Sequence, residues 1–276
     1  MNAAKERLTD THCHLMLPAF DKDREEVIAR ACTVGVARIL VPGVDLETSR
    51  QAVELAQNNA HIFAAVGIHP HNARTWNSRI KAEIGQLARS PGVVAIGEIG
   101  LDFYRNLSTP EEQKLAFRAQ LTLAAEMELP VVIHNRQAID DVLEDLLPWS
   151  QDVPPNIRNR AGVLHAFSAE DQAARLAIEA GFYLGVAGPL TYRNAQRQRE
   201  IVSQMPITRQ LLETDSPYLT PHPFRSKRNE PAHVKLVAER FADVMGISVR
   251  QAVDATWQNA SDLFDWNHGN HDRHLL

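Results

Sequence analysis

Eight short apolar segments recur along the 276-residue chain and constrain its fold more than any other feature. They are rich in Val, Ile, Leu and Ala, and their first residues follow one another at intervals of roughly 21 to 37 residues. Each interval leaves room for one helix and two short loops, which is the period of a parallel βα unit. The segments are Leu8–His14, Arg38–Val44, Ile62–His69, Val93–Gly100, Pro130–His134, Gly162–Phe167, Tyr183–Gly188 and Gln210–Thr214. Eight such units close a (β/α)8 TIM barrel, so the sequence predicts this α/β fold.

Several segments between the strands have the apolar spacing of amphipathic helices. They are Asp23–Val34, Leu46–Gln57, Glu111–Glu128, Glu170–Ala180 and Asn194–Gln204. We expect the proline-containing stretch Pro148–Arg160 to be a surface connection, because the βα period continues beyond it. A loop, Ser216–Pro231, and a helical region, Ala232–Phe264, follow the last strand. The sequence therefore predicts a single barrel domain over residues 1–264 and a polar, histidine-containing, flexible tail over 265–276.

Composition excludes other classes of protein. With 44% hydrophobic and 23% charged residues, the chain is too rich in core formers to be disordered. The N-terminal residues lack the apolar core of a signal peptide, and no apolar run approaches the roughly 18 residues of a spanning helix. Two cysteines cannot form a disulfide framework. We expect a cytoplasmic protein with no membrane association and no obligate protein partner. Its net charge of −5 means that a polyanionic substrate would need local basic residues or bound cations.

Histidines and acids stand at the carboxyl ends of the predicted strands. In a parallel barrel these ends meet at one rim, which carries the active site of such enzymes. His12 and His14 are two residues apart on one strand, so both imidazoles lie on one face and can share a metal ion. Asp10 precedes them and either hydrogen-bonds a ligand imidazole or ends the strand. The rim residues are His12, His14, His69, His71, Glu98, Asp102, His134, Arg136, His165 and Asp215.

Imidazoles and carboxylates together are typical of a site for divalent metal ions, with Zn²⁺, Mn²⁺ or Mg²⁺ as candidates. One ion needs three or four protein ligands, whereas six candidates are present, enough for two ions. The six are His12, His14, Glu98, His134, His165 and Asp215. Glu98, on the fourth strand, is the natural bridge between the ions. Two cations can deprotonate a water near neutral pH and neutralise a phosphoryl oxygen, which predicts a hydrolase that acts through a metal-bound hydroxide.

Seven segments, in order over nearly the whole chain, carry a resemblance to a known family. They are Thr9–His14, Gly67–His71, Gly97–Tyr104, Val132–Arg136, Leu164–Ser168, Leu212–Leu219 and Arg228–Pro231. Together they resemble the TatD family of metal-dependent deoxyribonucleases, within the wider amidohydrolase-type barrels. The resemblance implies a (β/α)8 barrel with a dinuclear site that cleaves phosphodiester bonds of DNA. It further implies a 3′→5′ exonuclease with single-stranded DNA as the preferred substrate.

The resemblance also implies roles for the rim residues. The metal ligands would be the six residues named above, with His134 and His165 on the second ion. Glu98 and Asp215 would be catalytic, and Asp215 would act both as ligand and as general base. His69 and Arg136 match positions that face a substrate phosphate, although His69 has the alternative of capping its own strand-end loop. We expect Asp102 and Arg228 to contact substrate as well.

Basic and aromatic residues after the last two strands bear on the substrate. The basic ones are Arg193, Arg197, Arg199, Arg225, Lys227 and Arg228, which are either a solvated surface or a phosphate-binding patch. Aromatic side chains near the rim could stack on the bases of a single strand, and Tyr192 and Phe224 are the best candidates.

Two other interpretations stay open at this point. Related barrels hydrolyse amides, lactones and phosphoesters with similar ligands, so a small substrate is an alternative to nucleic acid. In that case, replacing Arg197 and Arg228 would leave turnover unchanged. A non-catalytic interaction protein is the third interpretation. The complete ligand set opposes it, because buried acids and imidazoles without a metal are poorly paired.

Overall fold

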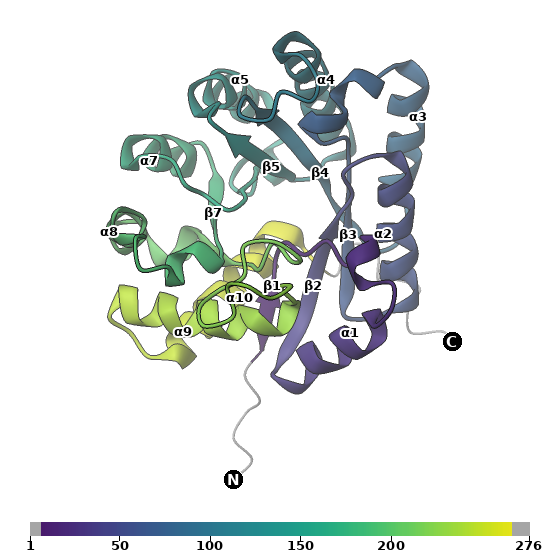
Figure 1. The fold of residues 1–276 in the computed structure, drawn as a ribbon. Helices are drawn as coiled ribbons and strands as arrows, with labels where there is room; N and C mark the ends of the chain where they lie inside the picture. The colour runs from purple at the N-terminus through teal and green to yellow at the C-terminus, as the bar shows by residue number, and fades with distance from the viewer. Residues whose placement is uncertain (1–6, 267–276) are drawn as a thin grey trace.

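The computed structural model describes residues 7–266 and arranges eight parallel strands in one sheet that curls into a barrel (Figure 1). Neighbouring strands in the sheet are neighbours in the sequence, from β1 to β8. The strands are β1 (Leu8–Asp10), β2 (Val36–Pro42), β3 (Ile62–Val66), β4 (Val93–Asp102), β5 (Val131–Arg136), β6 (Gly162–Leu164), β7 (Phe182–Val186) and β8 (Gln210–Leu212). Each overlaps one predicted segment, so the predicted fold is confirmed.

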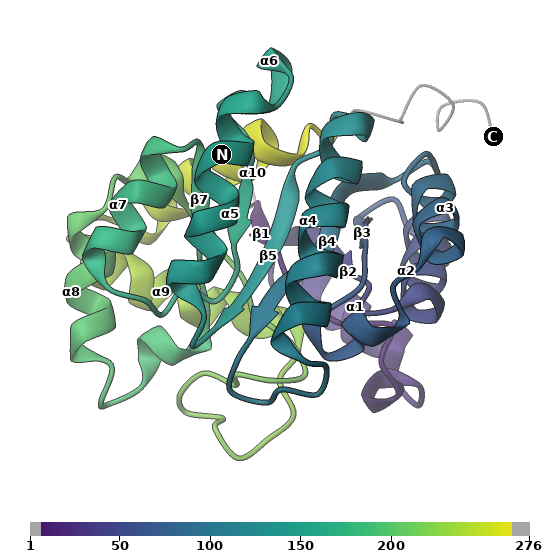
Figure 2. The same cartoon turned by 90° about the horizontal axis from the view of Figure 1, so that it is seen from above.

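Helices cover the outer face of the barrel (Figures 1 and 2). They are α1 (Arg24–Thr33), α2 (Leu46–Asn58), α3 (Ser78–Leu87), α4 (Pro110–Met127), α5 (Ile139–Asp152), α6 (Pro155–Arg158), α7 (Asp171–Glu179), α8 (Gln196–Gln204), α9 (Val234–Met245) and α10 (Val249–Phe264). Short 3-10 helices are η1 (Pro18–Phe20), η2 (Pro70–Thr75), η3 (Gly188–Thr191), η4 (Ile207–Arg209) and η5 (Pro231–His233). Helix α4 begins with a capping box: the Thr109 hydroxyl accepts a hydrogen bond from the Glu112 backbone N–H, and the Glu112 side chain accepts one from the Thr109 backbone N–H.

The stretch Pro148–Arg160 lies largely at the surface, as predicted, but much of it is helical. Helix α5 continues through Pro148 to Asp152, and α6 follows within the same stretch. Leu146 is fully buried, and Trp149 Nε1 donates a hydrogen bond of 2.8 Å to Leu121 O on α4. This packing holds the last turns of α5 in place and outweighs the backbone hydrogen bond that a proline removes.

The barrel closes between β1 and the segment after β8 through a set of individual contacts. Thr11 N donates to Leu212 O at 3.1 Å, and Asp215 N donates to His12 O at 2.8 Å. The buried Asp10 carboxylate accepts from both the amide (2.9 Å) and the hydroxyl (2.6 Å) of Thr214. Asp10 is the last residue of β1, as one of the two sequence alternatives proposed, and its carboxylate also joins the two ends of the sheet.

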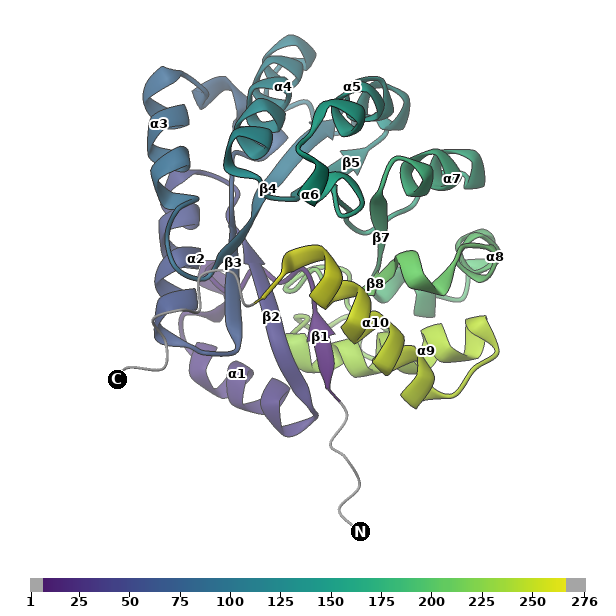
Figure 3. The ribbon, with the colours of Figure 1, turned by 180° about the vertical axis from the view of Figure 1, so that it is seen from behind.

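Helix α10 crosses the end of the barrel at which the strands begin (Figure 3). Leu263 and Phe264, at the end of this helix, belong to a buried cluster with side chains of the strands. Trp266 is 2% exposed, and its ring centroid lies 4.6 Å from that of Phe63 on β3. The packed chain thus extends two residues beyond the predicted limit at residue 264, and residues 267–276 of the predicted tail lie outside the described residues. Within residues 7–266, the structure contains no helix with the length and apolar character needed to cross a bilayer.

Candidate metal centre

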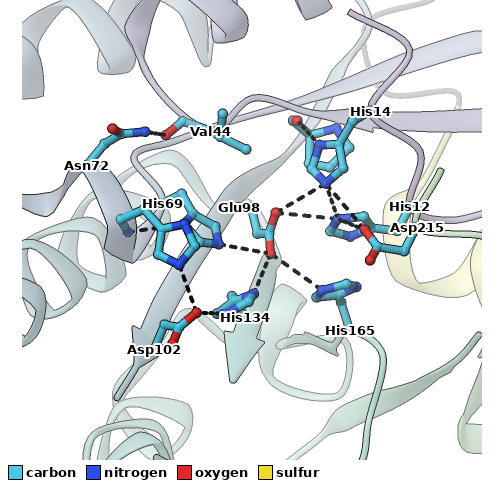
Figure 4. Close-up of polar contacts among 12 residues, drawn as sticks. His12, His14, Val44, His69, Asn72, Glu98, Asp102, His134, His165 and Asp215 are labelled. Atoms are coloured by element: carbon cyan, nitrogen blue, oxygen red, sulfur yellow. Dashed lines mark hydrogen bonds and ion pairs between the residues drawn. The ribbon is translucent and has the colours of Figure 1, made fainter. Parts of the chain in front are cut away.

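The carboxyl ends of the strands bring the predicted ligands together at a cavity of about 490 Å³ (Figure 4). Glu98, which projects from β4 and is 2% exposed, lies at the centre of the cluster. The two oxygens of its carboxylate face different groups of side chains. This arrangement divides the cluster into two donor sets, one on each carboxylate oxygen.

The first donor set lies on the side of Glu98 Oε2. His12 Nε2 is 3.4 Å and His14 Nε2 is 3.5 Å from this oxygen, and the two nitrogens are 3.1 Å apart. Asp215 Oδ1 completes the set at 3.4 Å from His14 Nε2 and 3.8 Å from His12 Nε2. Two imidazole nitrogens and two carboxylate oxygens therefore converge on one space, a combination that suits a divalent ion.

The second donor set lies on the side of Glu98 Oε1. His134 Nδ1 is 2.9 Å and His165 Nε2 is 3.4 Å from this oxygen. Because Glu98 presents one oxygen to each set, it has the position of a bridging ligand. His12 and His165, from different sets, stack with ring centroids 3.8 Å apart.

The remaining ring nitrogens decide which atoms can bind a metal. Three imidazoles place the nitrogen that faces away from Glu98 against an oxygen that can only accept a hydrogen bond. The partners are Pro42 O for His14 Nδ1 (3.3 Å), Asp102 Oδ2 for His134 Nε2 (3.3 Å) and Glu213 Oε1 for His165 Nδ1 (3.1 Å). When such a ring is neutral, a proton on the outer nitrogen leaves the lone pair of the inner nitrogen available for a metal ion at the centre. The fourth imidazole, His12, has a buried Nδ1 with no hydrogen-bond partner among the described residues.

Glu213 is a functional residue that the sequence analysis missed. It is fully buried, and its Oε1 also accepts a 2.6 Å hydrogen bond from Ala166 N. A Cβ atom at Gly185 would lie 2.5 Å from Glu213 Oε2, so glycine at that position leaves room for the carboxylate. A sequence signal was present: Glu213 and Asp215 are two residues apart, the same spacing that drew attention to the histidines of the first strand.

Both carboxylates at the centre are ionised at neutral pH. Burial alone would raise the pKa of Glu98, but the charges of the surrounding imidazoles outweigh burial and hold this pKa well below its usual range. Burial likewise opposes ionisation of Asp215, but its hydrogen bond with His14 and the nearby His165 lower the pKa of this carboxyl. Asp215 can therefore accept a proton from a water molecule in the cavity.

His69 caps its own loop, as one of the two sequence alternatives proposed. Its Nδ1 accepts a hydrogen bond of 3.1 Å from His71 N at the start of η2. Burial lowers the pKa of His69 well below the usual value, so the ring is neutral and its single proton is on Nε2. This Nε2 lies 3.6 Å from Glu98 Oε1 and presents a hydrogen there, which is unsuitable for binding a metal.

Asp102 and Arg136, two other predicted substrate contacts, differ in what surrounds them. Asp102 is fully buried, and its Oδ1 accepts from Tyr104 N (3.0 Å) and Arg105 N (2.7 Å). Its Oδ2 lies 2.8 Å from His71 Nε2, so Asp102 organises neighbouring side chains. Arg136 lines the cavity, as does Arg105, which the sequence analysis did not single out.

Arg228 lies away from the residues that line the cavity. Its guanidinium donates to both carboxylate oxygens of Asp23 (2.8 and 2.7 Å) and to Ala19 O (2.6 Å). Arg197 similarly pairs with Glu170 at 2.7 Å. The structure therefore engages both arginines in ion pairs and does not bring Arg228 together with the predicted site.

Comparisons with known proteins agree with this geometry. Residues 9–265 match the family model described as TatD related DNase. The chain is 41% identical over 94% of its length to all of "Uncharacterized metal-dependent hydrolase YabD" of Bacillus subtilis. It is 39% identical over 92% of its length to 98% of "3'-5' ssDNA/RNA exonuclease TatD" of Citrobacter koseri.

A solved structure gives the same result for the fold. The structure of the TatD homologue YjjV from Escherichia coli superposes with a TM-score of 0.88 and 31% identity, and covers 95% of this chain and 99% of that one. The match thus spans the whole barrel together with the strand ends that carry the ligands. Since the family model also covers these strand ends, the chain belongs to the family of TatD-related DNases and is a metal-dependent hydrolase.

Proposed function

We propose that this enzyme hydrolyses phosphodiester bonds of DNA, as a 3′→5′ exonuclease on single strands, with two divalent metal ions. The observation that carries this proposal is the pair of donor sets on the two oxygens of Glu98. His12, His14 and Asp215 would hold one ion, and His134 and His165 the other. Imidazole with carboxylate suits Zn²⁺ or Mn²⁺, and Mg²⁺ could support turnover at higher concentration.

The protein side chains have separate tasks in this reaction. When bound, a pair of divalent ions lowers the pKa of water and neutralises charge on the phosphoryl oxygens. Asp215 accepts the proton of the attacking water, because its carboxylate is ionised and opens to the cavity. Arg105 and Arg136 line the same cavity and supply positive charge for the phosphates of the strand.

Two further observations support the proposal. Relatives that are 39% and 38% identical to this chain over more than nine-tenths of its length are named 3′-5′ ssDNA/RNA exonucleases. The described residues also contain two free cysteines, Cys13 and Cys32, which agrees with a cytoplasmic location.

The proposal is tested with metal-stripped enzyme and an end-labelled single-stranded DNA oligonucleotide. Addition of Mg²⁺, Mn²⁺ or Zn²⁺ should restore cleavage, with a ladder that shortens from the 3′ end. Glu98→Ala and Asp215→Ala should each reduce the rate by at least about 10²-fold. Glu126→Ala removes a surface acid that pairs with Lys81, so this control should cleave normally.

If the metal-loaded wild type leaves DNA intact, the proposed substrate is wrong. Small phosphoesters and lactones would then be assayed with the same variants. Loss of their hydrolysis in Glu98→Ala would show that the site is catalytic but acts on a small molecule.

A further inference from the structure

Exposed hydrophobic side chains gather around the cavity. Among the described residues, four large hydrophobic side chains are more than half exposed: Tyr104, Leu107, Leu115 and Tyr218. Leu107 and Tyr218 line the cavity of the candidate metal centre. Tyr104 lies directly beneath the cavity-lining Arg136, with 4.0 Å between the guanidinium carbon and the ring centroid. Exposed apolar side chains that gather beside a cavity are typical of a ligand-binding surface.

The backbone of Tyr218 is held by hydrogen bonds, whereas its ring is exposed. Its backbone is held on both sides: its N donates to Asp215 O at 2.7 Å, and its O accepts from Asn229 Nδ2 at 2.6 Å. The ring meets the ligand His14 edge-on, with centroids 6.2 Å apart, while 56% of the residue stays exposed. The ring therefore stands immediately beside the first donor set, and a planar group can reach it from the cavity.

Charge is distributed unevenly around the mouth of the cavity. Arg105 follows β4 and Arg136 ends β5, whereas Tyr218 follows β8, on the far side of the ring of eight strands. The anionic backbone of a nucleic acid is attracted to the arginine wall. A base attached to that backbone would then face the opposite wall, where Tyr218 presents its ring.

The two aromatic residues that the sequence favoured are already engaged. The guanidinium of Arg225 covers the Tyr192 ring at 3.7 Å, and Phe224 stacks on His233 with centroids 5.0 Å apart. Neither residue lines the cavity. The geometry favours Tyr218 over both of them as a base-stacking residue.

We propose that Tyr218 is the stacking platform for the base of one of the two nucleotides that flank the scissile phosphate. The inference rests on the proposed nuclease function, and it assigns to Tyr218 the selection of single-stranded substrates. A base within a duplex is covered by its neighbours, so only an unpaired base can stack on this ring. Every base has a π-face, so the platform accepts all four bases while selecting single strands.

The test compares two enzymes on three substrates. Wild type and Tyr218→Ala are assayed on an oligonucleotide with all its bases, and on two others in which either the 3′-terminal or the penultimate nucleotide is abasic. Wild-type kcat/KM should fall roughly tenfold or more for one of the abasic substrates. Tyr218→Ala should show a similar loss on the complete oligonucleotide and no additional loss on that abasic one.

Two control variants separate stacking from a general disturbance. Tyr218→Phe keeps the ring and should retain the discrimination between complete and abasic substrates. Leu115→Ala removes another exposed side chain, 62% exposed on α4, and should behave as wild type.

Equal fractional losses for wild type and Tyr218→Ala on both abasic substrates would overturn the proposal, because the ring would then act only through its neighbours His14 and Asp215. A different result would show that the proposed nuclease function is wrong: wild type would cleave none of the oligonucleotides. The stacking role of Tyr218 would then be rejected as well.

Discussion

Each imidazole of the centre has a role that depends on the partner of its second nitrogen. His165 directs Nδ1 at the buried Glu213, so Nε2, which faces Glu98, is the nitrogen that would bind a metal ion once the ring is neutral. His69 uses Nδ1 to accept from a backbone amide, so its Nε2 presents a hydrogen to the same carboxylate. The two rings lie at similar distances from Glu98, but their hydrogen-bond partners favour His165 as the predicted metal ligand.

The contact of His165 with Glu213 leads to a prediction for metal affinity. Replacement of Glu213 by Gln removes the negative charge that holds the His165 proton on Nδ1. We expect the affinity for Zn²⁺ or Mn²⁺ to fall roughly 10- to 100-fold, as measured by competition with a chromophoric chelator. Glu170→Gln is the matched control, since Glu170 is an exposed acid paired with Arg197. Unchanged metal affinity in folded Glu213→Gln would show that this carboxylate does not orient the ligand.

At the scale of the secondary-structure elements, regular patterns were predictable and loops were not. The period of the apolar segments identified the eight strands. Their ends identified the residues that the structure brings together as predicted ligands, because a parallel barrel brings all such ends to one rim. Helix α3 was missed although Ile80, Ile84 and Leu87 have the spacing of one helix face; only Ile84 and Gly85 of its residues are buried. The roles of Arg228 and Tyr218 depend on how the loop after β8 folds against distant segments, and periodicity carries no information on this.

That loop is tied to α1 by an ion pair, which predicts a pH-dependent stability. The pKa of Asp23 is lowered to about 2, chiefly by its hydrogen bonds from Arg228. A carboxyl whose pKa is lower in the folded state stabilises the fold above its unfolded pKa of 3.8, and this contribution is lost as the pH falls toward 2. Asp23→Asn should therefore lower the urea midpoint at about pH 6, and its difference from wild type should shrink at about pH 3.

Asp21→Asn is the control for this experiment. Asp21 lies on the same turn, but it pairs with Arg24, three residues away, and its side chain is 61% exposed. Its replacement should change the urea midpoint little at either pH. A difference between Asp23→Asn and wild type that stays constant with pH would contradict the assignment of this ion pair.

For the whole molecule, closure of the barrel and assembly of the metal centre occur at the same place. His12 and His14 follow β1, and Asp215 follows β8, so the first donor set spans the junction between the two ends of the sheet. Asp215 N donates to His12 O at 2.8 Å, which joins the backbones of two ligands that are far apart in the sequence. His12 and His14 therefore reach Asp215 only when β1 and β8 lie side by side.

The hydroxyl of Thr214 should therefore contribute to the stability of the entire barrel. It donates to Asp10 Oδ2 at 2.6 Å and accepts from Ser216 Oγ at 2.7 Å, and all three residues are fully buried. Thr214→Val leaves these groups unpaired and should lower the free energy of unfolding, measured in urea, by about 1–3 kcal/mol. Thr9→Val is the matched control, since the buried Thr9 hydroxyl has no hydrogen-bond partner within residues 7–266, and its loss should not destabilise the protein. Equal losses in the two variants would mean that side-chain shape, and not the hydrogen bonds across the junction, stabilises the closed barrel.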